Sequence, residues 1–235
     1  MKLRGILASA LIAISPVLAG CTPQADEVEE ACADAVEPTL PQRLAFMAGH
    51  VEAGIALYRA GESVAGGPHL LHPVSESYAV EREGLDAIGF DPALFEAVSK
   101  ALEEGRPASE IEPQLAAAQA NLAEMRTAAG GEPVGLIRYL MNMIRDEYAV
   151  GVSDGAVTDV GEYQDAWGFA MVARQLADDL ATPNSEMVRA EINALIAMWP
   201  VDAPVPPSDP ASIDDVYGQV DAVLTALGSG QDSEG

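Results

Sequence analysis

Residues 41–60, PQRLAFMAGHVEAGIALYRA, decide how this chain folds. Large apolar residues recur there every three or four positions, which is the period of a helix with one buried face. The members of this stripe are Leu44, Met47, Val51, Ile55 and Tyr58. A proline at the start and Gly61 just past the end are typical of helix boundaries. We therefore expect a helix over 41–60.

The same spacing continues along the chain and predicts an all-α fold. Aromatic residues make up only 5% of the sequence, and no run alternates as a strand would. Further helices are expected over residues 73–88, 92–104, 109–128, 133–150, 159–180, 185–199 and 212–227. The Gly-Gly-Pro stretch before residue 73 reads as a loop, and Asp154-Gly155 as the turn of a miniature hairpin. Short connections favour an antiparallel helical bundle with short flanking helices.

The N-terminus predicts export and lipid attachment. Lys2 and Arg4 precede a short apolar run that ends in Leu-Ala-Gly-Cys21. The run is too short to span a bilayer but has the form of a secretory signal. Its end resembles the lipobox of bacterial lipoproteins, in which the cysteine becomes the acylated first residue. An ordinary signal peptide with an incidental cysteine is the alternative.

Composition then divides the chain into four segments. We expect a lipoprotein signal peptide over 1–20, an acidic tether over 21–40, a helical domain over 41–227 and a disordered tail over 228–235. Lipidation at Cys21 would hold the domain on the periplasmic face of a bacterial membrane, inner or outer. The remaining cysteine lies in the tether and receives no role.

The acidic balance of the chain limits its partners. The formal net charge is −25, and loss of the leader, with two basic residues and no acids, would move it to −27. Nucleic acid is excluded as a natural partner because no basic stripe is present to neutralise phosphates. Attachment to anionic lipid would depend on the acyl chains. An acidic surface concentrates cations, which suits metal handling and equally suits solubility.

All three histidines of the chain, His50, His69 and His72, lie within one short stretch. Imidazole is the commonest metal ligand. Glu76 adds a carboxylate four residues after His72, on the same side of a helix that begins at Pro73. A histidine and a carboxylate from one helix, joined by a histidine from another, form metal sites in helical bundles. Mixed nitrogen and oxygen ligation suits iron, copper or zinc rather than calcium.

Acids further along the chain are candidates to complete such a site. Glu147 ends one predicted helix, while Glu162 and Asp165 open the next, and Asp165 lies on an otherwise apolar stripe. Each has a structural alternative, since acids near a helix N-terminus stabilise it without a ligand. Helix capping and loop hydrogen bonds are the alternative for His69 and His72. The candidate metal ligands are His50, His72 and Glu76, followed by His69, Glu147 and Asp165.

Two blocks of this sequence resemble the helical extracytoplasmic domain of bacterial oxidase-dependent iron permeases. Residues 49–76 contain GHVEAGIALYRAG and PHLLHPVSE, and residues 146–169 contain DEYAVGVSDG and EYQDAWGF. The resemblance implies an iron-associated helical bundle, with imelysin-like iron-uptake lipoproteins as a more distant relation. The sequence departs from the permeases in lacking transmembrane helices and an Arg-Glu-x-x-Glu motif. We therefore expect a protein that binds, presents or senses a metal without transporting it.

Together these features predict a membrane-anchored periplasmic lipoprotein that binds a transition-metal ion for uptake or homeostasis. Iron is expected before copper or zinc, and metal-uptake or permease components are the expected protein partners. Two alternatives remain open, a structural or interaction lipoprotein without a metal site and a metal-dependent hydrolase or imelysin-type peptidase. The sequence carries no Gly-x-Ser-x-Gly, His-Glu-x-x-His or phosphate-loop motif, so we expect no enzyme.

Overall fold

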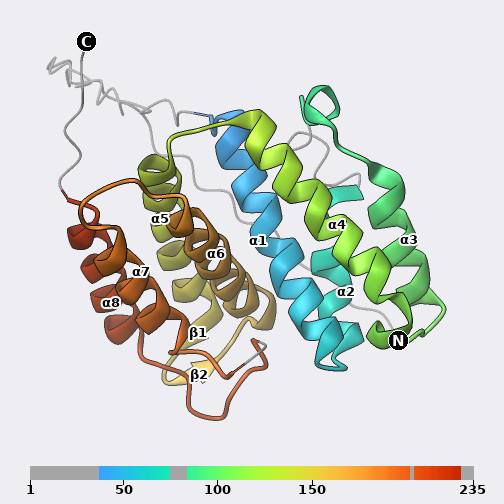
Figure 1. The fold of residues 1–235 in the computed structure, drawn as a ribbon. Helices are drawn as coiled ribbons and strands as arrows, with labels where there is room; N and C mark the ends of the chain where they lie inside the picture. Colours follow the sequence, from blue (N-terminus) through green and yellow to red (C-terminus); the bar gives the residue numbers. More distant parts are fainter. Residues whose placement is uncertain (1–36, 75–83, 202–203, 229–235) are drawn as a thin grey trace, which may run out of the picture. The chain divides into compact units, whose positions relative to one another are not determined.

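The computed structural model describes residues 37–74, 84–201 and 204–228, and helices make up nearly all of their regular structure (Figure 1). The α-helices are α1 (Leu40–Arg59), α2 (Ser63–Leu71), α3 (Pro92–Glu103), α4 (Ala108–Ala129), α5 (Pro133–Gly151), α6 (Val160–Asp178), α7 (Ser185–Ile196) and α8 (Ile213–Ala226). The shorter elements are the 3-10 helices η1 (His72–Val74) and η3 (Asp86–Ile88) and the strands β1 (Val152–Ser153) and β2 (Ala156–Val157). The predicted all-α fold is confirmed.

Several predictions concern residues outside the described ranges. The signal peptide with Cys21, most of the acidic tether, Glu76 and most of the C-terminal tail lie there. Among the helices of the described residues, none combines the length and the apolar content that crossing a membrane requires.

Local sequence signals set the helix ends. At the start of α1, the backbone N–H of Thr39 donates to Oε1 of Gln42 at 2.8 Å, and Pro41 occupies the first turn. At the start of α6, the side chain of Asp159 accepts from the backbone N–H of Gly161 at 3.0 Å. Because such signals are local, most predicted helix ends lie within two residues of the observed ones.

The predicted hairpin also forms. Asp154 and Gly155 have φ values of 52° and 75°, as a two-residue hairpin turn requires, and Val152 pairs with Val157 across the two antiparallel strands. The hairpin joins α5 directly to α6, so the end of one helix lies beside the start of the next.

Two predictions for the region between α1 and α3 are wrong. The Gly-Gly-Pro stretch forms α2 rather than a loop, although Pro68 lies inside the helix. A Cβ built on Gly66 would lie 2.7 Å from the carbonyl oxygen of Gly54, so the bare backbone lets α2 pack directly on α1. This packing outweighs a low helix propensity. The α-helix predicted over 73–88 is not present in the parts of this range that the structure describes. The short 3-10 helices η1 and η3 lie there instead, and Gly84 has a φ of 83°, which is not helical.

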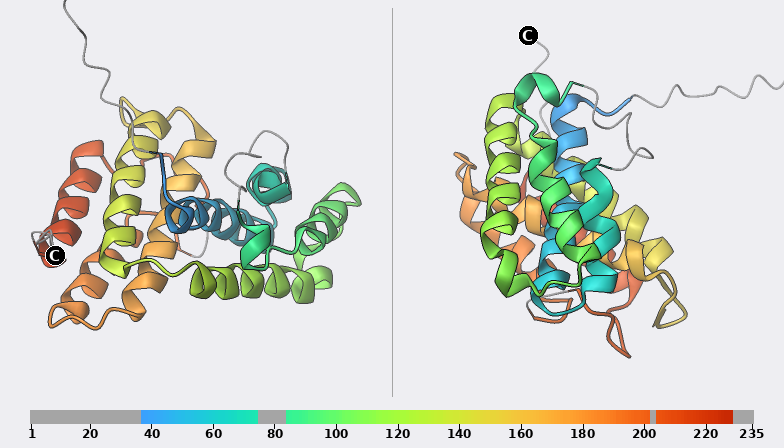
Figure 2. Two further views of the ribbon diagram at one scale, coloured as in Figure 1. Left: turned by 90° about the horizontal axis from the view of Figure 1, so that it is seen from above. Right: turned by 90° about the vertical axis from the view of Figure 1, so that its right-hand side faces the viewer.

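The helices form two groups that meet along α1 (Figure 2). Helices α1 to α4 pack on one another as the N-terminal helix group, and α5 to α8 pack on one another as the C-terminal bundle. Between the groups the main contact is α1 against α6, with a smaller one between α1 and α5. In the left view of Figure 2, the blue α1 lies between the remaining helices of both groups.

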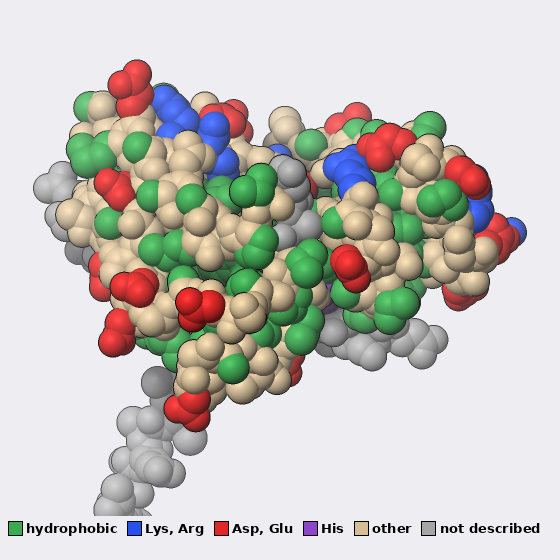
Figure 3. Space-filling model, turned by 90° about the horizontal axis from the view of Figure 1, so that it is seen from below, with side chains coloured by type: hydrophobic (Ala, Val, Ile, Leu, Met, Phe, Trp, Pro, Cys, Tyr) green, Lys and Arg blue, Asp and Glu red, His purple; other side chains and the backbone are tan. Residues whose placement is uncertain are grey.

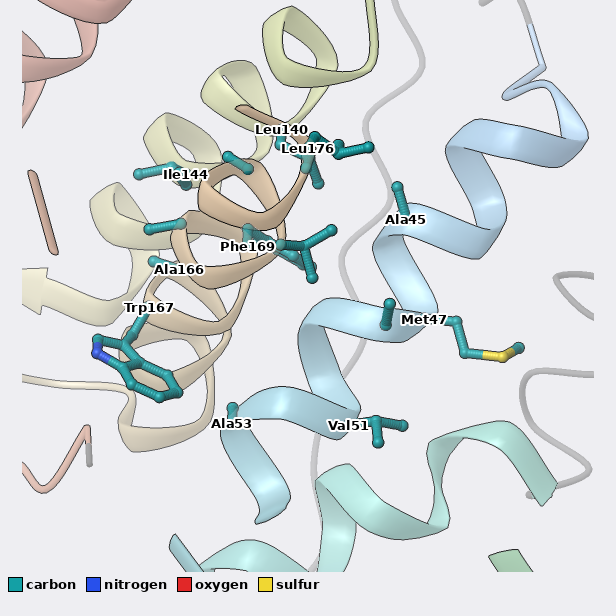
Figure 4. Packing of buried hydrophobic residues seen from close by; sticks show 14 of the residues in the cluster. Ala45, Met47, Val51, Ala53, Leu140, Ile144, Ala166, Trp167, Phe169 and Leu176 are labelled. Carbon is teal, nitrogen blue, oxygen red and sulfur yellow. The ribbon is translucent and has the colours of Figure 1, made fainter. Parts of the chain in front are cut away.

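The core is continuous because α1 contributes side chains to both groups. Figure 4 shows Ala45 and Ala53 on the side of α1 that faces α6, while Met47 and Val51 point the other way. All four are buried, with at most 1% of their surface exposed. A helix with apolar side chains on opposite sides can bury both of them between two groups of helices. Full burial of a side chain such as Met47 contributes about 1.5–3 kcal/mol to folding.

The crossing of α1 and α6 depends on two glycines. A Cβ built on Gly168 would lie 2.1 Å from the carbonyl oxygen of Gly49, and one built on Gly49 would lie 2.2 Å from Cδ1 of Phe169. A side chain at position 168 would force the two backbones apart, and one at position 49 would displace the ring of Phe169, since real Cβ atoms do not approach so closely. The crossing brings His50, next to Gly49, toward Asp165, one turn before Gly168.

Candidate metal centre

Three ligating side chains from three helices converge at this crossing. His50 comes from α1, His69 from α2 and Asp165 from α6, and one ligand atom from each lies within 4.8 Å of the others. Nδ1 of His50 is 2.6 Å from Oδ1 of Asp165, and Nδ1 of His69 is 2.8 Å from the same oxygen. Within the described ranges this is the only group of three or more such side chains.

The three side chains are buried without being fully hydrogen-bonded. His50, His69 and Asp165 are 7%, 6% and 6% exposed. Neither Nε2 of His50 nor Oδ1 of Asp165 has a hydrogen-bond partner among the described residues. Each of these close approaches to Oδ1 is an ion pair only when the imidazole carries a proton. Buried polar atoms are nearly always hydrogen-bonded, and exceptions point to a strained, catalytic or ion-binding role. The donor set fits a cation.

Gln164 orients the ring of His69. Its Oε1 lies 2.9 Å from Nε2 of His69, and the side chain is only 2% exposed. An amide oxygen can only accept, so Nε2 of His69 is the donor in this hydrogen bond, and Nδ1 is the ring nitrogen that faces Asp165. Metal-ligating histidines usually donate their second N–H to such a partner. Gln164 is not among the residues predicted from the sequence, although its polarity beside Asp165 in an apolar stretch is a usable signal.

Electrostatics favour an anionic Asp165. Burial alone raises the pKa of this carboxyl group, but His50 and His69 outweigh it and lower the pKa to about 2. Burial lowers the pKa of His69, yet Asp165 and Gln164 more than offset this, so the pKa of His69 is raised above its usual 6.5. The site therefore attracts positive charge, whether a proton on His69 or a metal ion.

Aromatic rings enclose His50. The ring of His72 stacks on it with centroids 3.9 Å apart, and the ring of Phe46 meets it edge-on at 4.6 Å. His72 is 2% exposed and lies in the η1 turn just after α2. It stands beside the three converging donors and is not one of them. His72 therefore forms a wall of the site in this structure, where the sequence predicts a ligand.

Two further carboxyl groups meet near the three donors. Glu147 of α5 hydrogen-bonds Glu162 of α6, and both are half-buried. Burial, this hydrogen bond and the neighbouring charges of Glu162 and Asp165 raise the pKa of Glu147 to about 9. Glu147 is therefore protonated at neutral pH and donates the hydrogen bond.

The donors line a pocket of about 370 Å³. Its walls include His50, His69, His72, Glu162, Gln164 and Asp165. Figure 3 shows one face of the molecule on which a histidine side chain is visible in a recess. A larger hollow of about 870 Å³ lies between α1, α6 and α7, but the converging donors do not line it. The smaller pocket is therefore the candidate site.

The predicted ligands divide into three sets by position. Three meet in the pocket: His50, His69 and Asp165. Two lie outside this group of three: His72 stacks on His50, and Glu147 is hydrogen-bonded to Glu162. Glu76 lies outside the described residues.

Comparison with known families bears on the second half of the chain. Residues 123–232 match the model of the iron permease-associated 4-helix bundle domain. The match takes in α5 to α8 and the last turns of α4, and confirms the predicted resemblance to the helical domain of iron permeases. It covers the second resembling block but not the first, which carries the histidines. The family is named for its association with iron permeases. No curated protein and no solved structure matches the chain.

Proposed function

We propose that this iron permease-associated helical protein binds a transition-metal ion, iron first, through His50, His69 and Asp165. The observation that carries the proposal is the convergence of these donors from α1, α2 and α6 in one buried pocket. The ion is cargo of an uptake or homeostasis system. The match to an iron permease-associated domain supports this context.

The chemistry of the donors favours iron. Two imidazoles and one carboxylate with open positions are the ligand set of many non-haem Fe(II) sites. Calcium prefers an all-oxygen shell, which histidines cannot supply. A net charge of −25 further raises the local concentration of cations at the surface. Copper and zinc also accept imidazole and compete for such a site.

The proposed attachment to a membrane is inferred from the sequence alone. Residues 1–21 carry the features of a lipoprotein signal, and acylation of Cys21 would hold the domain at the periplasmic face of a membrane. A binding role near a permease would then place the ion where a transporter could receive it. We propose no enzymatic activity.

Titration of metal-free protein without a histidine tag tests the proposal. Fe(II) without oxygen, Cu(II) and Zn(II) are added separately at neutral pH while thermal unfolding is followed. Metal at a hundredfold its Kd should stabilise the wild type by about 2.7 kcal/mol. His50→Ala, His69→Ala and Asp165→Asn should each remove most of this gain.

The matched control is Asp178→Asn, which removes an exposed carboxylate from the far end of α6. It should bind metal as the wild type does. A wild-type melting curve unmoved by all three metals would overturn the proposal. It would favour the structural alternative, in which the buried His–Asp contacts only stabilise the fold.

A further inference from the structure

Glu162 shares the pocket and the helix face of Asp165. It lies three residues earlier on α6, and residues three apart on a helix lie on the same side. Its side chain lines the same pocket as His50 and His69.

Charge balance calls for a second carboxylate. A divalent ion held by two neutral imidazoles and the Asp165 carboxylate would leave one net positive charge. The three donors are each less than a tenth exposed, and an uncompensated buried charge is costly. Apart from Asp165, the only carboxylate among the pocket's described lining residues is Glu162. His50 also lines this pocket, and its buried Nε2 has no hydrogen-bond partner among the described residues.

We infer that Glu162 is the fourth protein ligand of a divalent transition-metal ion, so that the site is made of two histidines and two carboxylates. This inference rests on the proposed function. It assigns both acids to α6 and both histidines to the neighbouring helices α1 and α2. Glu162 would neutralise the bound ion. In this structure, Glu162 is hydrogen-bonded to Glu147.

Cobalt(II) is the probe that tests this ligand, because its visible absorption changes with the number and type of ligands. Full-length, untagged, metal-free protein is titrated at pH 7.5, and both the Kd and the spectrum are recorded. Glu162→Gln keeps the shape of the side chain and removes its charge. We expect it to weaken Co(II) binding by about ten- to a hundredfold and to change the spectrum of the bound ion.

Glu110→Gln is the matched control, since Glu110 occupies the same first-turn position of α4 that Glu162 occupies in α6. Any effect through the helix dipole alone would be similar in both variants. Circular dichroism of each variant verifies that it folds. Glu162→Asp, which keeps the charge on a shorter side chain, should retain more affinity than Glu162→Gln.

The outcomes separate this inference from the proposed function. If Glu162→Gln binds Co(II) with wild-type affinity and spectrum while Asp165→Asn does not, the fourth ligand is wrong and the three-donor site stands. If the wild type binds no Co(II), both fail. A loss of affinity equal in Glu162→Gln and Glu110→Gln would also overturn the inference.

Discussion

The N-terminal helix group and the C-terminal bundle differ in what each brings to the candidate site. The C-terminal bundle matches a known family, and the candidate ligands that it supplies are the carboxylates of Asp165 and Glu162. The N-terminal group lies almost entirely outside the match and supplies the histidines. Neither group alone holds the full donor set. The candidate site therefore depends on the packing between the groups, and a metal ion there would bridge them.

Separating the two groups should produce the largest effect. Gly168→Ala places a Cβ against the backbone of α1, so α1 and α6 must move apart. Overpacking of this kind costs about 1–3 kcal/mol of unfolding free energy. The variant should also lose metal binding, because Asp165 would no longer meet the histidines. Chemical denaturation and metal titration measure the two effects.

Gly218→Ala in α8 is the control for this substitution. A Cβ there meets nothing within 4 Å, so the gain in helix propensity should stabilise the protein by about 0.5–1 kcal/mol. Equal effects at Gly168 and Gly218 would contradict the view that the glycine crossing holds the groups together.

The next-largest effect should come from lowering the pH, which weakens binding of the metal ion that bridges the two groups. Metal binding requires a neutral His69, whose pKa is raised above 6.5. Protons on this one side chain should therefore weaken metal affinity by at least about tenfold between pH 7.5 and 5.5, which corresponds to at least about 1.4 kcal/mol.

Without metal, the His69 contribution to stability has the opposite sign. A raised pKa in the folded state means that the ion pair with Asp165 stabilises the protein fully below pH 6.5. This contribution is lost as the pH rises through the folded-state pKa. Unfolding measured with and without metal across this range should show the two opposite trends. Metal affinity that is constant from pH 7.5 to 5.5 would exclude His69 as a ligand.

The smallest expected effect on the contact between the two groups comes from Glu147, which lies within the C-terminal bundle. Its pKa rises from 4.5 to about 9 on folding, so the folded state binds more protons between these values. Wild-type stability should therefore gain from Glu147 at low pH and lose that contribution as the pH rises toward 9. Glu147→Gln should flatten this dependence in metal-free protein. Chemical denaturation at several pH values measures this dependence, and Glu124→Gln, at an exposed position, is the control. Parallel plots of unfolding free energy against pH for the wild type and Glu147→Gln would contradict the prediction.

The sequence by itself determined the helical fold and most of the helix ends. Apolar spacing in residues 41–60, the cap at Asp159 and the Asp154-Gly155 turn act over a few neighbouring residues, so they can be read without knowing the fold. The same locality explains the errors. The Gly-Gly-Pro stretch looks like a loop until α1 is seen packed against Gly66.

Only the tertiary structure decided which candidate side chains meet. The sequence suggested six ligands, but it gave His69 and Asp165 less weight than His72 and Glu76. The distance between α1 and α6 depends on the contact of Gly49 with Gly168, more than a hundred residues away. No local pattern records such a contact, because it is made between backbones that approach only after the chain has folded.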